Sequence, residues 1–145
     1  MISPALLAAF PNLAFGDPAV VLPPDARYNC VAWAAGVTDA WWWPGDPAGY
    51  WPPAAPQEET VAAVVAALGT AGFMPCADGT PEAGFDRAAV YVRAGATTHV
   101  AVQRSGGRWS SKLGRDCVVG HATPAALEGV VFGKVVVYFR RAAGS

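Results

Sequence analysis

Charged residues are scarce in this chain of 145 residues, making up 14% of it with a formal net charge of −1 at pH 7. Without an excess of Lys and Arg, the chain lacks the attraction to phosphate that nucleic-acid binding requires, so we expect no nucleic-acid partner. It also lacks any uninterrupted apolar run near the ~20 residues of a membrane-spanning helix, and we expect no membrane segment. Hydrophobic residues still make up 53% of the sequence, which predicts a sizeable core and a single domain over residues 1–145.

Basic residues are missing from the N-terminus, where the first Lys or Arg is Arg27. Because a secretory signal peptide begins with a positively charged segment, the sequence predicts a cytoplasmic protein, or one exported by a route without a cleavable signal peptide. Three widely spaced cysteines, Cys30, Cys76 and Cys117, do not fit a disulfide framework and favour a reducing compartment. We expect Cys76 and Cys117 to be ordinary core thiols or to pair with each other.

Motifs for cofactors and metals are also absent. No segment reads G-x-G-x-x-G or G-x-x-x-x-G-K, so we expect no nucleotide cofactor. Cys117 and His121 are four residues apart, but their segment does not have the pattern of a helix, so we expect no metal site. His121 precedes Ala122-Thr123-Pro124, and we interpret it as a loop or capping residue.

Capping residues and apolar spacing predict three helices in the first half of the chain. A short helix starts at Ser3 and ends before Pro11. Residues 29–36 begin with a capping Asn, are rich in Ala and end at a Gly, which predicts a short buried helix with Cys30 in its first turn. An acidic start and one-sided apolar spacing predict a third helix over residues 57–69, packed on a sheet.

The second half of the chain has the alternation and turn residues of β-strands. The predicted strands cover residues 88–92, 98–103, 108–113 and 130–140, the last bent at Gly133, with a hairpin turn at 105–107 and a one-turn helix at 123–129. Helices followed by an antiparallel meander predict an α+β fold, in which the helix bearing Cys30 packs on an antiparallel sheet.

Residues 39–56 combine Trp and Pro at a density that excludes a helix interior or a central strand, so we predict an aromatic loop. Trp41, Trp42 and Trp43 cannot all point the same way in an extended segment, so at least one should reach the surface or a groove. An exposed Trp near a reactive thiol suits stacking on a sugar ring, gripping a peptide or contacting a partner protein. We expect Trp42 and Trp43 to contact a substrate.

Imidazole chemistry is restricted to two residues, His99 and His121. His99 lies at the start of a predicted strand, and Cys30 lies at the start of a predicted helix. The positive end of a helix and a nearby imidazole both lower the pKa of a thiol and make it a nucleophile. Cys30 and His99 are therefore the candidate reactive pair.

The sequences around this pair resemble the papain-like cysteine hydrolases, in particular their NlpC and CHAP branches. The carrying motifs are Tyr28-Asn29-Cys30-Val31-Ala32-Trp33-Ala34 and, 69 residues after the cysteine, His99-Val100-Ala101-Val102. The likeness covers roughly residues 27–113 and implies a papain-like core. Two segments, 41–44 and 109–114, lie outside the usual pattern and indicate a divergent branch.

The resemblance implies a role for each matching residue. Cys30 would be the nucleophile, His99 the general base, and Tyr28 a donor near the oxyanion together with the backbone N–H of Cys30. Counting round the hairpin turn places Ser111 near His99, where its hydroxyl would hold the imidazole tautomer, although the family more often uses His, Asn, Gln or Asp there. The other candidates for this third position are Ser110, Lys112, Asp116, Gln103 and His121.

Three functional hypotheses follow. The leading one is a cysteine-dependent amide hydrolase or acyl-transfer enzyme that acts on a peptide, isopeptide or cell-wall-like amide through a thioester at Cys30, and it requires Cys30 and His99 to lie across one groove. The second is a non-catalytic binding module whose Trp-rich loop engages a partner protein, with Cys30 sealed or far from His99. The third is a toxin or effector domain that uses the same pair to deamidate a target protein.

Overall fold

The computed structural model describes residues 2–144, which form an α+β fold around one seven-stranded antiparallel sheet. The strands are β1 (Ala19–Leu22), β2 (Met74–Cys76), β3 (Phe85–Arg93), β4 (Ala96–Gln103), β5 (Trp109–Lys112), β6 (Val118–His121) and β7 (Lys134–Ala142). The α-helices are α1 (Pro4–Ala9), α2 (Cys30–Ala35) and α3 (Val61–Gly69), and the 3-10 helices are η1 (Pro11–Phe15) and η2 (Pro124–Leu127).

The strand order in the sheet is β1-β6-β5-β4-β3-β7-β2. Strands β3 to β6 follow one another as an antiparallel meander, and β7 returns to pair with the free side of β3. The three central strands and the turn between β4 and β5 confirm the predictions from the sequence. Gly106 in that turn has a φ of +74°, a conformation that glycine adopts without strain.

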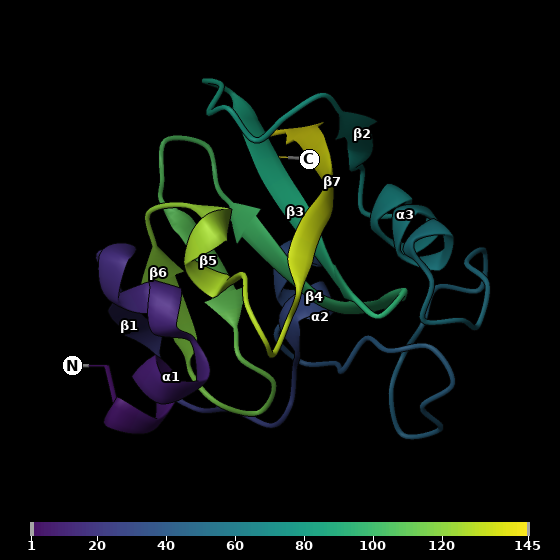
Figure 1. Ribbon diagram of the computed structural model, residues 1–145. Helices are drawn as coiled ribbons and strands as arrows, with labels where there is room; N and C mark the ends of the chain where they lie inside the picture. The colour runs from purple at the N-terminus through teal and green to yellow at the C-terminus, as the bar shows by residue number, and fades with distance from the viewer. Residues whose placement is uncertain (1, 145) are drawn as a thin grey trace.

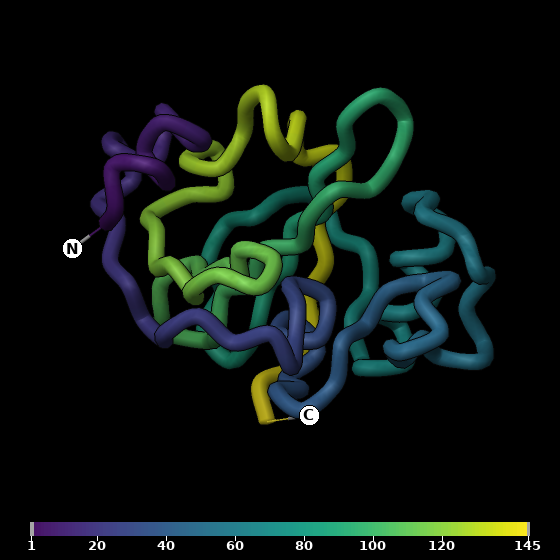
Figure 2. The backbone as a smooth tube through the Cα atoms, turned by 90° about the horizontal axis from the view of Figure 1, so that it is seen from below, coloured from purple at the N-terminus to yellow at the C-terminus, as the bar shows by residue number. Residues whose placement is uncertain are grey.

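A hydrophobic core lies on each face of the sheet, because successive strand residues point to opposite sides. On one face Val90 and Val100 pack with buried residues of α2 and α3. On the other face Tyr91 packs with Leu13 of η1 and Leu127 of η2. Figure 1 shows α2 behind the sheet and α1 in front of it. In Figure 2 the purple N-terminal segment lies beside the yellow-green segment that contains η2, and η1 and η2 are in contact.

The helices begin and end where their capping residues place them. Ser3 caps α1 through the backbone N–H of Leu6, as predicted. Helix α3 begins at Val61, four residues later than the predicted start at residue 57, because the side chain of Thr60 caps it and the preceding residues make tertiary contacts. Among these, the side chain of Gln57 accepts a hydrogen bond from the N–H of Gly45.

Membrane-spanning helices are not found in the part of the chain that the structure describes, since none of its helices has the necessary length and apolar character.

The prediction for His121 was wrong: this residue is the last of strand β6 and is completely buried. Four residues carry little local signal for a strand, and β6 exists because it pairs with β5 on one side and with β1 on the other. The last strand also differs, since β7 starts at Lys134, after Gly133, and runs to Ala142.

Candidate active site

Helix α2 places Cys30 at its first position. The side chain of Asn29 accepts a hydrogen bond from the backbone N–H of Ala32, and Gly36 ends the helix with a φ of +90°. Both signals are local, which is why the sequence located this helix. Cys30 is itself part of the core between α2 and the sheet, and its side chain is 6% exposed.

Strand β4 carries His99 beside the same helix. The β3–β4 register pairs His99 with Tyr91 and then shifts at Val92, which pairs with Thr97, so that Thr98 is the extra residue of a bulge. His99 is 1% exposed, and its ring centre lies 5.2 Å from that of Tyr91. A bulge re-aims the side chains next to it, and here those side chains are Thr98 and His99.

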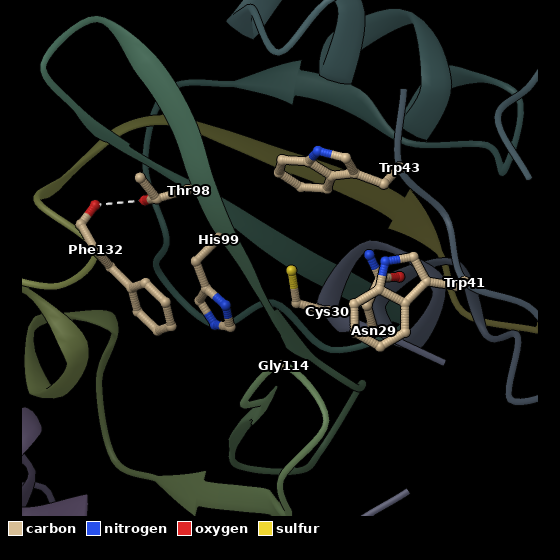
Figure 3. A pocket seen from close by; sticks show the side chains of 8 residues that line it. All are labelled: Asn29, Cys30, Trp41, Trp43, Thr98, His99, Gly114 and Phe132. Carbon is tan, nitrogen blue, oxygen red and sulfur yellow. Dashed lines mark hydrogen bonds between the residues drawn. The ribbon is translucent and has the colours of Figure 1, made fainter. Parts of the chain in front are cut away.

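Cys30 and His99 line one pocket of about 340 Å³, together with Asn29, Trp41, Trp43, Thr98, Gly114 and Phe132. Figure 3 shows the side chains of Cys30 and His99 next to each other on the lining of this pocket. None of the lining residues carries a carboxylate, an ammonium or a guanidinium group. The pocket is therefore suited to an uncharged group.

Asn29 also fixes the aromatic loop over the pocket. Its Oδ1 accepts a hydrogen bond of 3.0 Å from the N–H of Trp42, and its Nδ2 donates one of 2.7 Å to the carbonyl oxygen of Trp42. Trp42 itself is buried at 8% exposure, whereas its neighbours Trp41 and Trp43 line the pocket. The prediction that the three tryptophans point in different directions is confirmed, and the structure places Trp41, rather than Trp42, beside Trp43 at the pocket.

Phe132 holds the ring of His99, a contact that the sequence did not indicate. The two rings are stacked with centres 4.1 Å apart and an interplanar angle of 3°. The hydroxyl of Thr98 donates a hydrogen bond to the carbonyl oxygen of Phe132, as Figure 3 shows. Gly133 allows the segment that follows Phe132 to pass close to the backbone of β3. Its φ is +79°, and a Cβ there would lie 2.0 Å from the carbonyl oxygen of Val92.

Burial keeps both reactive groups neutral. Desolvation raises the pKa of the Cys30 thiol to about 11, and the backbone amides of Val100, Val31 and Cys30 lower it only in part. Desolvation also lowers the pKa of His99 well below its usual 6.5. Nε2 of His99 is buried without a hydrogen-bond partner among residues 2–144. The resting pair is thus a thiol and a neutral imidazole.

The side chains predicted to orient His99 are used elsewhere. Ser111 is completely buried, and its hydroxyl lies 2.9 Å from Nε2 of His121. Ser110 accepts a hydrogen bond from the indole of Trp33, and Gln103 donates one to the carbonyl oxygen of Gly107. Asp116 accepts a hydrogen bond from the backbone N–H of Cys117. The structure instead shows the ring of Phe132 stacked on the face of the His99 imidazole.

Tyr28 lies next to the site but not in the pocket lining. It is 3% exposed, and burial raises the pKa of its hydroxyl. Its ring centre lies 4.7 Å from Nζ of Lys112, and its carbonyl oxygen accepts a hydrogen bond from the same Nζ. The structure therefore places Tyr28 as part of the support of α2 and gives no geometry for an oxyanion donor.

The cysteines do not pair: Cys30, Cys76 and Cys117 are all free, so the alternative of a Cys76–Cys117 pair was wrong. Cys76 lies on β2, and Cys117 is buried in the core that contains Tyr91. Within residues 2–144, no cluster of three or more His, Cys, Asp or Glu side chains could hold a metal ion.

Residues 19–140 match the sequence profile of a family described as Domain of unknown function (DUF7689). No curated protein and no solved structure matches the chain.

Proposed function

The chain belongs to the DUF7689 family, and from the pocket on α2 and β4 we propose that it is a cysteine-dependent hydrolase or acyl-transfer enzyme with a papain-like core that cleaves an amide, or a related acyl bond, through a thioester at Cys30. The observation that carries this proposal is that Cys30 and His99, which are 69 residues apart in sequence, line the same small pocket. Trp41 and Trp43 line this pocket as well, and Nε2 of its lining residue His99 has no hydrogen-bond partner within residues 2–144.

The proposed reaction begins with a neutral pair. As Sγ of Cys30 attacks the carbonyl carbon of the substrate, a lone pair of the His99 imidazole takes the thiol proton. The carbon–nitrogen bond then breaks, the amine leaves with that proton, and the acyl group remains on Cys30 as a thioester. Attack by water, or by an acceptor alcohol or amine, releases the acyl group and restores the thiol.

General-base transfer fits this site better than a preformed thiolate–imidazolium pair. The pKa of Cys30 is raised by burial and that of His99 is lowered by it, so neither group is charged near pH 7. A neutral imidazole has one ring nitrogen with a free lone pair, and that nitrogen can accept the proton of the thiol. Charge would thus form only when a substrate is in place.

The lining indicates the part of the substrate that binds next to the reacting carbonyl. Trp41, Trp43 and Phe132 supply aromatic surface, whereas Thr98 and Asn29 supply few polar atoms that are not already engaged. An uncharged acyl group with an apolar or aromatic side chain suits such a pocket.

The experiment that tests the proposal is hydrolysis of a panel of p-nitrophenyl esters and peptide p-nitroanilides, with mass spectrometry to locate any acyl group on the protein. We compare wild type with Cys30→Ala and with Cys117→Ala, which removes a second buried thiol of the same size. We expect acylation at Cys30, loss of turnover in Cys30→Ala and retained turnover in Cys117→Ala. Equal turnover in all three proteins would overturn the proposal.

The burial of Cys30 favours one alternative, a non-catalytic binding module. At 6% exposure, with its pKa raised to about 11, the thiol is less reactive than a free cysteine. In this alternative Trp41 and Trp43 bind an apolar group of a partner, and Cys30 contributes only to packing. Cys30→Ala would then leave binding of an apolar ligand, measured by quenching of tryptophan fluorescence, unchanged, and no acylation of wild type would be seen.

A further inference from the structure

Lys112 is a charged side chain with no exposed surface and forms no salt bridge within residues 2–144, which is unusual for a lysine. Its Nζ donates three hydrogen bonds, to the carbonyl oxygens of Asp25, Tyr28 and Gly114, at 2.5, 3.1 and 2.6 Å. All three acceptors are backbone carbonyls, so the hydrogen bonds are satisfied while the positive charge is not neutralised by a contacting carboxylate.

The three carbonyls connect the two sides of the candidate site. Tyr28 lies two residues before Cys30 in the segment that leads into α2, and Gly114 lines the pocket in which Cys30 and His99 lie. Lys112 itself is on β5, and its ammonium lies over the ring of Tyr28 at 4.7 Å. One buried ammonium therefore ties the segment that leads into α2 to Gly114 of the pocket lining.

The charged and titratable groups around Lys112 come from three segments: Asp25 and Tyr28 before α2, Cys30 on α2, and Asp116 and Cys117 between β5 and β6. The carboxylate of Asp25 is already bound by Arg27 at 2.7 Å, and that of Asp116 accepts a backbone N–H. Of the groups that face Lys112, Cys30 is the one that lines the pocket with His99.

We propose that Lys112 is a positioning and charge-stabilising residue, which holds both walls of the pocket and stabilises the negative charge that develops at Cys30 during acylation. This inference rests on the proposed function. A buried ammonium without a contacting anion is costly, even when its hydrogen bonds to carbonyl oxygens are satisfied. A role at the nucleophile explains why a positive charge is kept at this position. Burial has the largest effect on the pKa of Cys30 and raises it. Backbone amides lower this pKa in part, and Lys112 is the side-chain charge that also lowers it.

The first test is the rate of Cys30 alkylation by iodoacetamide between pH 8 and pH 10, measured by mass spectrometry relative to Cys76 in the same sample. Lys112→Met keeps the length of the side chain and removes its charge, and Lys134→Met removes the only other lysine, which is exposed on β7. We expect the Cys30 to Cys76 ratio to fall about threefold to tenfold in Lys112→Met, as loss of a nearby buried charge implies, and to stay constant in Lys134→Met. An unchanged ratio in a folded Lys112→Met protein would overturn the proposal.

A second test needs no substitution. Cys30 of the wild type is alkylated either with iodoacetate, which adds a carboxylate, or with iodoacetamide, which adds a neutral amide of the same size. The ammonium of Lys112 is then titrated by NMR, with Lys134 as the internal reference. Because coupling between two sites is reciprocal, we expect a higher pKa for Lys112 in the carboxymethylated protein. Equal values in the two adducts would overturn the proposal.

Both tests measure the interaction between Lys112 and Cys30 without substrate turnover. If alkylation or titration shows no coupling, the role of Lys112 fails even in an active enzyme. If coupling is present and the ester and anilide panel shows no acylation at Cys30, the charge interaction stands and the proposed reaction is what fails.

Discussion

The two histidines of this protein have the same burial and opposite surroundings. His99 and His121 are 1% and 0% exposed, and desolvation is the main reason that the pKa of each lies below 6.5, to about 4 for His121. His121 has both ring nitrogens engaged: Nδ1 donates to the carbonyl oxygen of Thr123, and Nε2 accepts from the hydroxyl of Ser111. Among the described residues 2–144, Nε2 of His99 has no hydrogen-bond partner, and its ring is stacked on that of Phe132.

This difference separates a structural histidine from one that is available for chemistry. Removing His121 would leave the hydroxyl of Ser111 and a carbonyl group unpaired, whereas removing His99 would delete a buried polar atom that has no partner. His99 also borders the pocket that contains Cys30, and His121 does not line it. The imidazole group therefore stabilises the fold at position 121 and destabilises it at position 99.

The same substitution at both positions should affect the two histidines very differently. We expect His121→Leu to lower the free energy of unfolding by about 3 kcal/mol, because it strands two buried hydrogen-bonding groups. We expect His99→Leu, which has a similar volume, to change it by less than about 1 kcal/mol in either direction. Urea denaturation followed by tryptophan fluorescence measures both. A larger loss in His99→Leu than in His121→Leu would contradict the distinction.

Asn29 supports the pocket that contains His99, because it caps α2 and bonds the backbone of Trp42. Asn29→Ala removes the cap of α2 and both hydrogen bonds to Trp42, and we expect it to cost about 2 kcal/mol. Thr60→Ala, which removes only the cap of α3, is the matched control, with an expected cost of about 1 kcal/mol. Equal losses of unfolding free energy in the two variants would mean that the hydrogen bonds of Asn29 to Trp42 contribute little.

The stability of the protein should depend on pH through both buried histidines. Each histidine has a folded pKa below its unfolded value of 6.5, so each is neutral in the fold and binds a proton more readily when unfolded. The contribution of each neutral histidine to the free energy of unfolding is therefore fully present above pH 6.5 and is lost as the pH falls toward the folded pKa of that histidine. Each histidine contributes up to about 1.4 kcal/mol per pH unit in that range. We expect His99→Leu to reduce the slope between pH 6 and pH 5 by up to one proton, and an unchanged slope would show that His99 is not desolvated.

The smallest expected effect concerns Ser111. Ser111→Ala removes one hydrogen bond to His121, and we expect a loss of about 1 kcal/mol in the free energy of unfolding. Because this hydroxyl bonds His121 and not His99, we expect the rate of Cys30 acylation to stay within about twofold of wild type. A fall of about a hundredfold in a stable Ser111→Ala protein would restore Ser111 as the third catalytic group.

The parts of the site that the sequence could predict are those encoded by neighbouring residues. Asn29 and Gly36 bracket α2 within one short segment, so the position of Cys30 at its start follows from local capping. The alternation in β3 and β4 likewise predicts the strand that carries His99.

The remaining parts depend on pairings between distant segments. Ser111 was expected near His99 by counting round the hairpin, but β5 also pairs with β6, and the register places His121 within reach of its hydroxyl. The stacking of Phe132 on His99 depends on the return of β7 beside β3 and on the close passage of Gly133. No local pattern in residues 130–134 indicates either contact.

The role of His99 as the base that activates Cys30 is tested most directly by the rate of Cys30 acylation by p-nitrophenyl acetate at pH 7.5. The rate is compared in wild type and in His99→Leu, with the acylated residue identified by mass spectrometry. Because burial raises the pKa of Cys30 to about 11, very little thiolate exists at this pH, and fast acylation requires a general base. We expect His99→Leu to acylate at least about a hundredfold more slowly while remaining folded, and only the wild type to show a solvent deuterium isotope effect. Equal acylation rates in the two proteins would contradict the assignment of His99 as the base that activates Cys30.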